Sequence, residues 1–381
     1  MQFVHSEEQQ LIRDSARELL AAHATPAQVR ATLQQPLGYD PELWRQMSSE
    51  LGWVGLALPT SCGGAGLGWV ELCLLQEELG RRLVASPFFG TAALAAPLVQ
   101  ALASEAQQRV LLSRIASGKV RIACVLGGAD GRPPPEGVSV ELRAGRGGAR
   151  LQGVGDFVIH GDAADLLLVL TRAPAGLRVA VIAATAAGVR VQPRVMLDLT
   201  RPMARVEFTD VAVTAEELLG GEGAEQGIEQ GLQRARIALA AEALGGAERL
   251  LQMTTDYVRE RVQFGRPIGS FQAVKHRLAD MMVQVEAAKS AAWYAACVAD
   301  ECPAQLAEAA AIAKSTCCDA FFDCAANAIQ LHGGIGFTWE HEAHLYFKRA
   351  RASAVLLGSP AWQRERLTRL IGGGAAATPL F

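Results

Sequence analysis

A change in the hydrophobic pattern along the chain is the feature that most constrains its fold. Residues 6–118 carry apolar side chains at the spacing of amphipathic helices. From Lys119 to about residue 215 the chain instead shows short β-rich runs separated by clusters of Gly, Pro and Asp. From about residue 222 helical periodicity returns in long segments. The pattern predicts a helical region, a β region and a second helical region, in that order.

The β-rich runs predict an antiparallel barrel or sandwich. No helix-length pattern lies between the runs, so the crossover helices that a parallel sheet requires are not expected. The runs are VRIACVL, VSVELR, DLLLVL, LRVAVIA and VRV.

The last region predicts a four-helix bundle. Long helices are expected near 224–261, 270–300 and 303–332, and small residues such as Ala240 and Gly245 allow such helices to approach closely. The chain is therefore expected to be an α+β multidomain protein. Its predicted parts are an N-terminal helical domain at 1–118, a middle β domain at 119–217, a C-terminal bundle at 218–371 and a flexible tail at 372–381.

Composition limits the classes of partner. The net charge of -3 argues against nucleic acid or an anionic membrane, and no apolar run reaches membrane-spanning length. The first residues, MQFVHSEEQQ, are acidic and polar, unlike a signal peptide. Eight cysteines show no CxxC pair and no metal-ligand spacing. We therefore expect a cytoplasmic protein with reduced thiols, no membrane segment and no metal.

The segment RVQFGRPIGSFQAVKHRLADM, residues 261–281, is the most informative motif. Arg261 ends one predicted helix, and Ser270 is the predicted N-cap of the next, with Gln272 in its first turn. A guanidinium, an amide and a helix N-terminus could together bind phosphates, and Phe264 adds a flat apolar surface. On spacing alone, an ordinary helix-turn-helix corner explains the segment equally well.

Two adjacent glycines follow the third long helix of the last region. Gly333 and Gly334 stand where left-handed glycines are expected to end a helix. Because glycine has no side chain, the same pair could let backbone amides approach a ligand closely. A simple helix stop remains the alternative.

Four segments, in order along the chain, resemble the acyl-CoA dehydrogenase flavoproteins. They are GWVGLALPTSCGGAGLGWVELCLLQEELG (52–80), VEFTDVAV (206–213), the 261–281 segment and QLHGGIGFTWEHEAHLYFKRA (330–350). The resemblance implies the family's fold of helical domain, β domain and helical bundle. It also implies an acyl-CoA substrate and an FAD cofactor, bound between the β domain and the bundle and completed at its adenine end by a neighbouring subunit.

By this resemblance, two strips of the chain contact the adenine and pyrophosphate end of FAD. The predicted contact residues are Arg261, Phe264, Gln272, Gln330, Gly333 and Gly334.

The segments that hold the flavin ring in the family depart from its pattern. The family's Thr-Glu-Pro-type segment corresponds to ACVLGGADG (123–131), which has no hydroxyl. Its Trp-Ile-Thr segment corresponds to Phe157, Val158 and Ile159. Because isoleucine cannot donate a hydrogen bond, the β domain of this chain is not expected to hold the ring in the usual way.

The catalytic carboxylate of the family is also missing. Leu357 occupies the position used by most members, and Ala235 the position used by a second branch. Neither can accept the α proton of a thioester. Glu242 shares a helix face with Ala235 and is a candidate displaced base, with pairing to an arginine as its structural alternative. Arg236 corresponds to a family residue near the thioester and could instead be an ion-pair partner.

These departures favour the non-catalytic subunit of a heteromeric acyl-CoA dehydrogenase. The chain resembles one component of α2β2 assemblies that act on steroid side-chain or other bulky thioesters, where the partner carries the base and holds the ring. Two alternatives remain, namely a self-sufficient homotetrameric dehydrogenase with a displaced base and a flavin-free scaffold.

Overall fold

The computed structural model describes residues 5–145, 148–221 and 223–372. Its contacts define two compact units. The helical unit comprises Met1–Ala27, Cys73–Val84 and Arg236–Phe381, and the sheet unit comprises Gln28–Leu72 and Ala85–Ala235. The predicted boundaries at 118 and 217 stay predictions. The predicted flexible tail lies outside the described residues except for Gly372.

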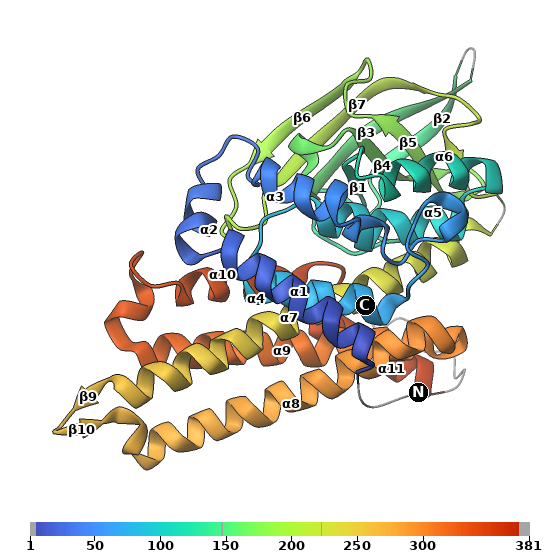
Figure 1. Ribbon diagram of the computed structural model, residues 1–381. Helices are drawn as coiled ribbons and strands as arrows, with labels where there is room; N and C mark the ends of the chain where they lie inside the picture. Colours follow the sequence, from blue (N-terminus) through green and yellow to red (C-terminus); the bar gives the residue numbers. More distant parts are fainter. Residues whose placement is uncertain (1–4, 146–147, 222, 373–381) are drawn as a thin grey trace. The chain divides into compact units, whose positions relative to one another are not determined.

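The sheet unit is built on one eight-stranded sheet (Figure 1), with strand order β6-β7-β3-β2-β4-β5-β8 and with β1 placed beside β4. The strands are β1 (Ile122–Val125), β2 (Val140–Gly145), β3 (Gly148–Ile159), β4 (Leu166–Ala173), β5 (Gly176–Ala183), β6 (Val189–Arg194), β7 (Met203–Val213) and β8 (Leu218–Leu219).

The sheet is predominantly antiparallel, as the sequence predicts, but β4 has two parallel neighbours. β1 pairs with residues 166–169 of β4, and β2 pairs with the same strand at Thr171 and Arg172. Two strands therefore follow one another along one side of β4. The core beneath the sheet is aliphatic, with Leu151, Leu167 and Val206 fully buried.

Helix α6 (Glu105–Ala116) of the sheet unit begins at a serine cap. Ser104 forms a capping box with Gln107 at the start of this helix. The Gln107 side chain also donates to the carbonyl of Leu218, which ties α6 to β8. The sheet unit also contains α3 (Pro41–Arg45), a π-helix at Gln46–Glu50, a second π-helix at Phe89–Ala95 and α5 (Ala96–Leu102), together with short 3-10 turns.

The helical unit contains the long helices that the periodicity predicts. Figure 1 shows α8 and α9 side by side, and α7 meets α9 where Gly246 lies against Phe321. Helices α10 and α11 pack on α9. Three helices cross from one unit to the other along the chain: α2 (Pro26–Thr32), α4 (Trp69–Arg81) and α7 (Ala224–Glu260). The others are α1 (Glu7–His23), α8 (Gln272–Glu301), α9 (Leu306–His332), α10 (Ala343–Val355) and α11 (Pro360–Ile371).

Two glycines bring α4 and α7 into direct backbone contact. A Cβ on Gly80 would lie 2.0 Å from the carbonyl oxygen of Glu242, and one on Gly245 would lie 1.8 Å from that of Glu77. Real side chains cannot approach so closely, so both positions require glycine. The last turns of α4 are therefore part of the same core as α7.

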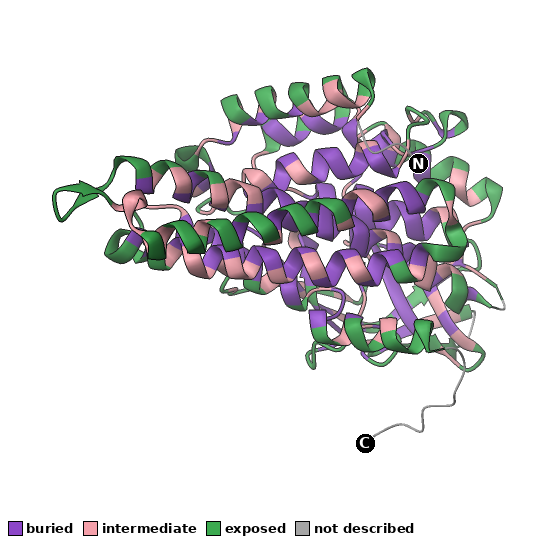
Figure 2. Cartoon of the chain, turned by 90° about the horizontal axis from the view of Figure 1, so that it is seen from below, coloured by how far each residue is buried: buried purple, intermediate pink, exposed green. Residues whose placement is uncertain are grey.

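Burial in the helical unit follows the faces of its helices (Figure 2), with buried residues between helices and exposed ones outside. The hairpin of β9 (Val262–Gln263) and β10 (Arg266–Pro267) is exposed throughout and forms the green tip at the left of the figure. Within the described residues, no helix is both long enough and apolar enough to cross a bilayer.

Candidate functional site

The first predicted strip begins at a tight hairpin that follows α7. Phe264 and Gly265 both have left-handed backbone angles, with φ of 54° and 76°, as two-residue hairpins require. Phe264 is 91% exposed and meets Phe271 edge-on, with 6.1 Å between the ring centroids. The flat apolar surface predicted from the sequence is thus presented outward.

Arg261 has a fixed backbone and an unpaired side chain. Its amide donates to the carbonyl of Tyr257, and its own carbonyl accepts from Ile268, both at 2.8 Å. The guanidinium is exposed and has no hydrogen-bond or ion-pair partner among the described residues. A guanidinium that extends from a fixed backbone and is exposed can bind an anion such as a pyrophosphate through two parallel hydrogen bonds.

Helix α8 begins one residue later than predicted. Its N-cap is Phe271 and not Ser270, whose hydroxyl donates to the carbonyl of Pro267 at 2.7 Å. The prediction of a serine cap is therefore wrong, because this hydroxyl closes the preceding turn. No side chain caps the helix, and Gln272 is exposed in its first position. The N-terminal amides can bind an anion in place of a cap.

The second strip follows α9, whose Gln330 is exposed near its end. Gly333 has φ of 63° and ψ of -143°, a conformation that disfavours any side chain but is not the left-handed helical one that was expected. Gly334 has no positive φ, so the expectation is wrong for it. A Cβ at either residue would meet nothing within 4 Å. Nothing among the described residues therefore explains a glycine at 334, whereas a close-lying ligand would.

Helix packing brings the two strips to the same end of the bundle. Arg277 of α8 donates to Asn327 of α9 at 3.4 Å, and this antiparallel register continues toward Gln272 and the end of α9. Tyr257 of α7 stacks on His332, with ring centroids 4.3 Å apart. The end of α7, the start of α8 and the end of α9 are therefore neighbours, and the assignment of their residues to an FAD site stays a prediction.

The position of the common catalytic carboxylate is closed. Leu357 is 5% exposed in a left-handed conformation, with φ of 58°. Its carbonyl accepts hydrogen bonds from Arg236 at 3.1 Å and from Gln363 at 3.0 Å. Ala235, at the alternative base position, is fully buried. Neither side chain can take a proton.

Arg236 makes the contacts of a structural cation. It is 1% exposed, bonds the Leu357 carbonyl and lies 5.2 Å from the centre of the Trp362 ring. A buried guanidinium is stable only when such partners replace water. A contact between Arg236 and substrate stays a prediction.

Glu242, the candidate displaced base, is buried in an ion pair. Its Oε1 atom lies 2.8 Å from Nη1 of Arg349, and the two residues are 6% and 3% exposed. This is the structural alternative named from the sequence. It ties α7 to α10, and it favours a packing role over a catalytic one.

The backbone donors near the flavin-ring segment are already used. The amide of Phe157 donates to Asp156 at 2.9 Å, and that of His160 donates to the carbonyl of Pro202 at 2.9 Å. Ile159 is 5% exposed and pairs with Met203 in the sheet.

An ion pair closes the same segment. Asp156 has a fully buried carboxylate, and Arg194 holds its pKa below the usual range by a hydrogen-bonded ion pair. This arrangement engages the Asp156 carboxylate within the sheet unit.

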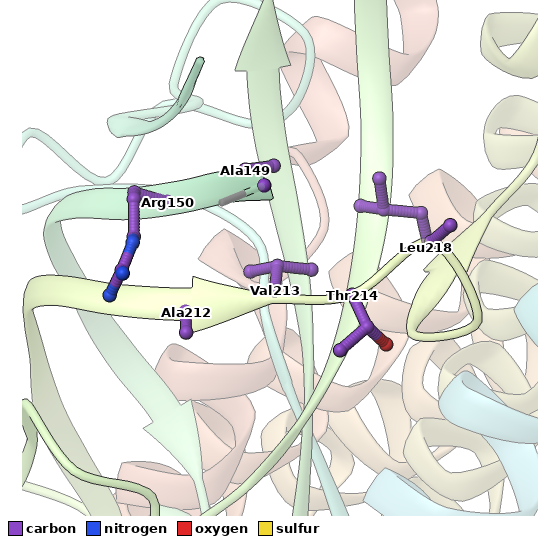
Figure 3. Close-up of a pocket in the computed structure, with 8 residues that line it drawn as sticks. Ala149, Arg150, Ala212, Val213, Thr214 and Leu218 are labelled. Atoms are coloured by element: carbon purple, nitrogen blue, oxygen red, sulfur yellow. The ribbon is translucent and has the colours of Figure 1, made fainter. Parts of the chain in front are cut away.

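A cavity in the sheet unit lies away from the predicted site residues in sequence. It has a volume of about 390 Å³ and opens between β3, β7 and the start of β8 (Figure 3). Arg150 is its one charged lining residue and donates to the carbonyl of Asp210. The other lining residues are Gly148, Ala149, Ala212, Val213, Thr214, Ala215 and Leu218.

Comparison with known proteins assigns the family. Sequence models of the acyl-CoA dehydrogenase N-terminal and C-terminal domains match residues 6–119 and 221–372. Because relatives of this class also match over almost the whole length, the chain belongs to the acyl-CoA dehydrogenase family, whose members are FAD-dependent oxidoreductases. The fold predicted from the sequence is thereby confirmed.

Three relatives are particularly similar. Acyl-CoA dehydrogenase IpdE2 of Mycobacterium tuberculosis is 39% identical, with 96% of each chain covered. A chain of the ChsE4-ChsE5 complex from Mycobacterium tuberculosis is 30% identical, with a TM-score of 0.90 over 99% of this chain and 100% of that one. A variant of the Tcur3481-Tcur3483 steroid ACAD is 31% identical, with a TM-score of 0.87 over 97% and 99%.

The sequence reading missed two features of the site. The uncapped start of α8 has Arg266 lying over the Phe271 ring at 4.2 Å. The rings of Tyr257 and His341 both contact His332. The Arg266 contact is local and could have been considered from spacing, whereas the ring contacts join residues far apart in sequence.

Proposed function

We propose that this chain is the non-catalytic subunit of a heteromeric acyl-CoA dehydrogenase, and that it completes the adenine side of an FAD site whose ring and base belong to a partner subunit. The observation that carries the proposal is the contrast between Leu357 and Arg261. The base position is filled by a buried aliphatic side chain, whereas the phosphate-side guanidinium is exposed and has no partner among the described residues.

The fit of FAD differs between the two groups of residues. The adenine-side residues fit, because Arg261, with no hydrogen-bond or ion-pair partner among the described residues, and an uncapped helix start offer donors for a pyrophosphate, and two glycines leave open space beside them. The ring-side residues do not fit, because Ile159 is buried and the amides of Phe157 and His160 are engaged within the sheet. We therefore assign the adenine-side contacts to this chain and the contacts with the flavin ring to the partner subunit.

Exposed apolar side chains next to the adenine-side strips support a protein partner there. Phe264 and Phe337 are 91% and 76% exposed. Large apolar side chains that cluster on a surface often mark a protein interface. The others in the same two segments are Val262, Ile335 and Trp339.

The reaction itself explains why a partner is required. Bound FAD supplies the hydride acceptor of the family reaction, and removal of the α proton needs a carboxylate. A missing positioned base typically costs 10²–10⁴-fold in rate. Since Leu357 and Ala235 cannot fill that role and Glu242 is paired with Arg349, the base is assigned to the other subunit.

The substrate class is proposed from the similar proteins. One of them is described as a steroid ACAD, and another was solved as a two-component complex. We propose a steroid-derived or similarly bulky acyl-CoA thioester, an α2β2 assembly and a cytoplasmic location.

Purification alone and with a partner tests the proposal. The partner is a co-expressed family member that retains Glu before Gly at the base position and the Trp-Ile-Thr segment. We expect the chain alone to be colourless and inactive, and the complex to hold FAD and oxidise acyl-CoA. A yellow, active homomer that loses activity on Glu242→Gln would support the self-sufficient alternative. A stable protein that recruits no flavin with any partner would support the scaffold.

A further inference from the structure

We propose that the rings of Tyr257, His332 and His341 form a clasp that positions the glycine loop, residues 333–340, for contact with FAD. The inference rests on the proposed function and adds three positioning residues to it. None of the three is among the predicted contact residues.

Ring contacts join the two ends of the glycine loop. His332 directly precedes the loop and His341 directly follows it, and their ring centroids lie 4.3 Å apart at 46°. Tyr257 of α7 lies 4.3 Å from the His332 ring at 26°, which is a stacked geometry. Aromatic pairs at such distances attract one another beyond simple burial. The loop is therefore closed at its base and anchored to a second helix.

Hydrogen bonds fix the orientation of the two imidazoles. Nδ1 of His332 lies 2.7 Å from the carbonyl of Ala328, and because a carbonyl only accepts, this nitrogen carries the proton. In His341 the Nδ1 atom accepts the amide of Ala343 at 3.1 Å. The hydroxyl of Tyr257 donates to the His332 carbonyl at 3.4 Å, next to Gly333.

The His332 ring is held in its uncharged form. The residue is 3% exposed, and its Nε2 atom is buried without a hydrogen-bond partner among the described residues. Burial lowers the pKa of His332, because a second proton would have no acceptor there. A neutral ring stacks on its neighbours without charge repulsion.

The loop between the histidines folds back on α9. A Cβ on Gly336 would lie 3.1 Å from both the His332 Cβ and the Ile329 carbonyl, so this glycine sits directly on the last turn of the helix. The hydroxyl of Thr338 donates to the carbonyl of Ile335 at 2.9 Å. The clasp and these contacts hold the backbone of Gly333 and Gly334 in one place. The space that a Cβ would occupy at either residue is empty.

Hydrogen exchange of the full chain tests the clasp without a partner or ligand. His332→Ala should speed amide exchange of residues 333–340 by about 3- to 10-fold, the loss expected for one aromatic pair. His332→Phe keeps a flat ring and should stay within about twofold of the parent. Tyr257→Leu gives an independent measurement if the alanine variant does not fold, and His23→Ala on α1 is the histidine control. Unchanged exchange in both His332→Ala and Tyr257→Leu would overturn the clasp.

FAD release from the co-expressed complex tests the positioning role. His332→Ala should release FAD about 3- to 10-fold faster, with recovery in His332→Phe. Arg261→Ala, a predicted direct contact, is measured in parallel. If Arg261→Ala speeds release and His332→Ala does not, the positioning role is wrong while the proposed function stands. If neither variant alters release, the proposed function fails and the positioning role fails with it.

Discussion

Two turns of the helical unit share a left-handed backbone conformation but place their side chains in opposite environments. Phe264 and Gly265 in the hairpin both have positive φ, and so do Leu357 and Gly358 between α10 and α11. The hairpin turns its phenyl ring into solvent, with 91% of Phe264 exposed. The corner turns its leucine inward, with 5% exposed.

The contrast extends to the cations beside each turn. Arg261 leaves its guanidinium unused beside the hairpin, whereas Arg236 bonds the Leu357 carbonyl inside the bundle. A surface that leaves donors free can bind something outside the chain. A corner that uses its cation for an internal hydrogen bond serves stability. Under the proposed function, the comparison teaches that a family site can lose its chemistry in one place and keep its binding groups in another.

The largest expected effect distinguishes the buried ion pair of Glu242 and Arg349 from the exposed Arg261. Arg349→Met leaves the Glu242 carboxylate buried without its partner and should lower the free energy of unfolding by about 3–5 kcal/mol. Arg261→Met, on the exposed hairpin, should change it by less than about 0.5 kcal/mol. Denaturant midpoints measure both. Equal effects of the two substitutions would break the comparison.

The next effect concerns FAD binding at Arg261. Arg261→Ala should weaken FAD binding by the complex roughly 10- to 100-fold, because a charge-assisted hydrogen bond to a phosphate is lost. Arg261→Lys should recover only part of the loss, since lysine lacks the two-pronged guanidinium. Flavin fluorescence after dilution reports the affinity. Unchanged affinity in the alanine variant would remove Arg261 from the site.

Substitutions of Gly333 and Gly334 by alanine separate an effect on stability from an effect on FAD binding. Gly333→Ala should cost about 1–3 kcal/mol of stability, because its φ of 63° strains any side chain. Gly334→Ala should leave stability unchanged, because its backbone and surroundings accept a methyl group. It should still weaken FAD binding if a ligand approaches that residue. Thermal melting of the chain and FAD titration of the complex separate the two quantities, and a destabilised Gly334→Ala would contradict the account.

The last expected effect, spread over several pH units, is a slope of stability with pH that arises from the buried Glu77 of α4. Burial, and then the nearby Glu248 carboxylate, raise the pKa of Glu77 from 4.5 to about 8. Between these values the folded chain holds a proton that the unfolded chain releases, so stability falls as pH rises. The fall should reach at most about 1.4 kcal/mol per pH unit and end above the folded pKa.

Glu77→Gln should flatten this slope, as measured by denaturant unfolding at successive pH values. A slope that persists in the variant would assign the proton to another group. Substitutions at the exposed hairpin should leave the slope unchanged.

Much of the architecture was readable from the sequence because strong local signals agree with the final packing. The periodicity placed α7, α8 and α9 within a few residues of their observed ends. Strand β3 was missed because its glycines hide it. A Cβ on Gly155 would lie 2.0 Å from Val125, and one on Gly153 would lie 2.6 Å from the carbonyl of Ser139. These glycines permit close strand packing and lower the β signal at the same time.

The candidate site was predicted less completely, for a different physical reason. Arg261 and Gln272 lie in one motif, and the family resemblance supplied Gly333. The ring contact between Tyr257 and His332 joins residues that only the folded bundle brings together. The N-cap at Phe271 depended on whether the Ser270 hydroxyl would turn toward the helix or toward Pro267, and local sequence does not decide between these.

The direct contact of α4 with α7 has a consequence for dissecting the molecule. The boundary between the two matched family domains falls long after residue 84, yet Gly80 and Gly245 press the end of α4 against the bundle. A fragment cut at that boundary would expose a backbone groove shaped for a missing helix. Two such fragments, expressed separately, should remain insoluble or poorly folded, and mixing them during refolding should restore the bundle by complementation.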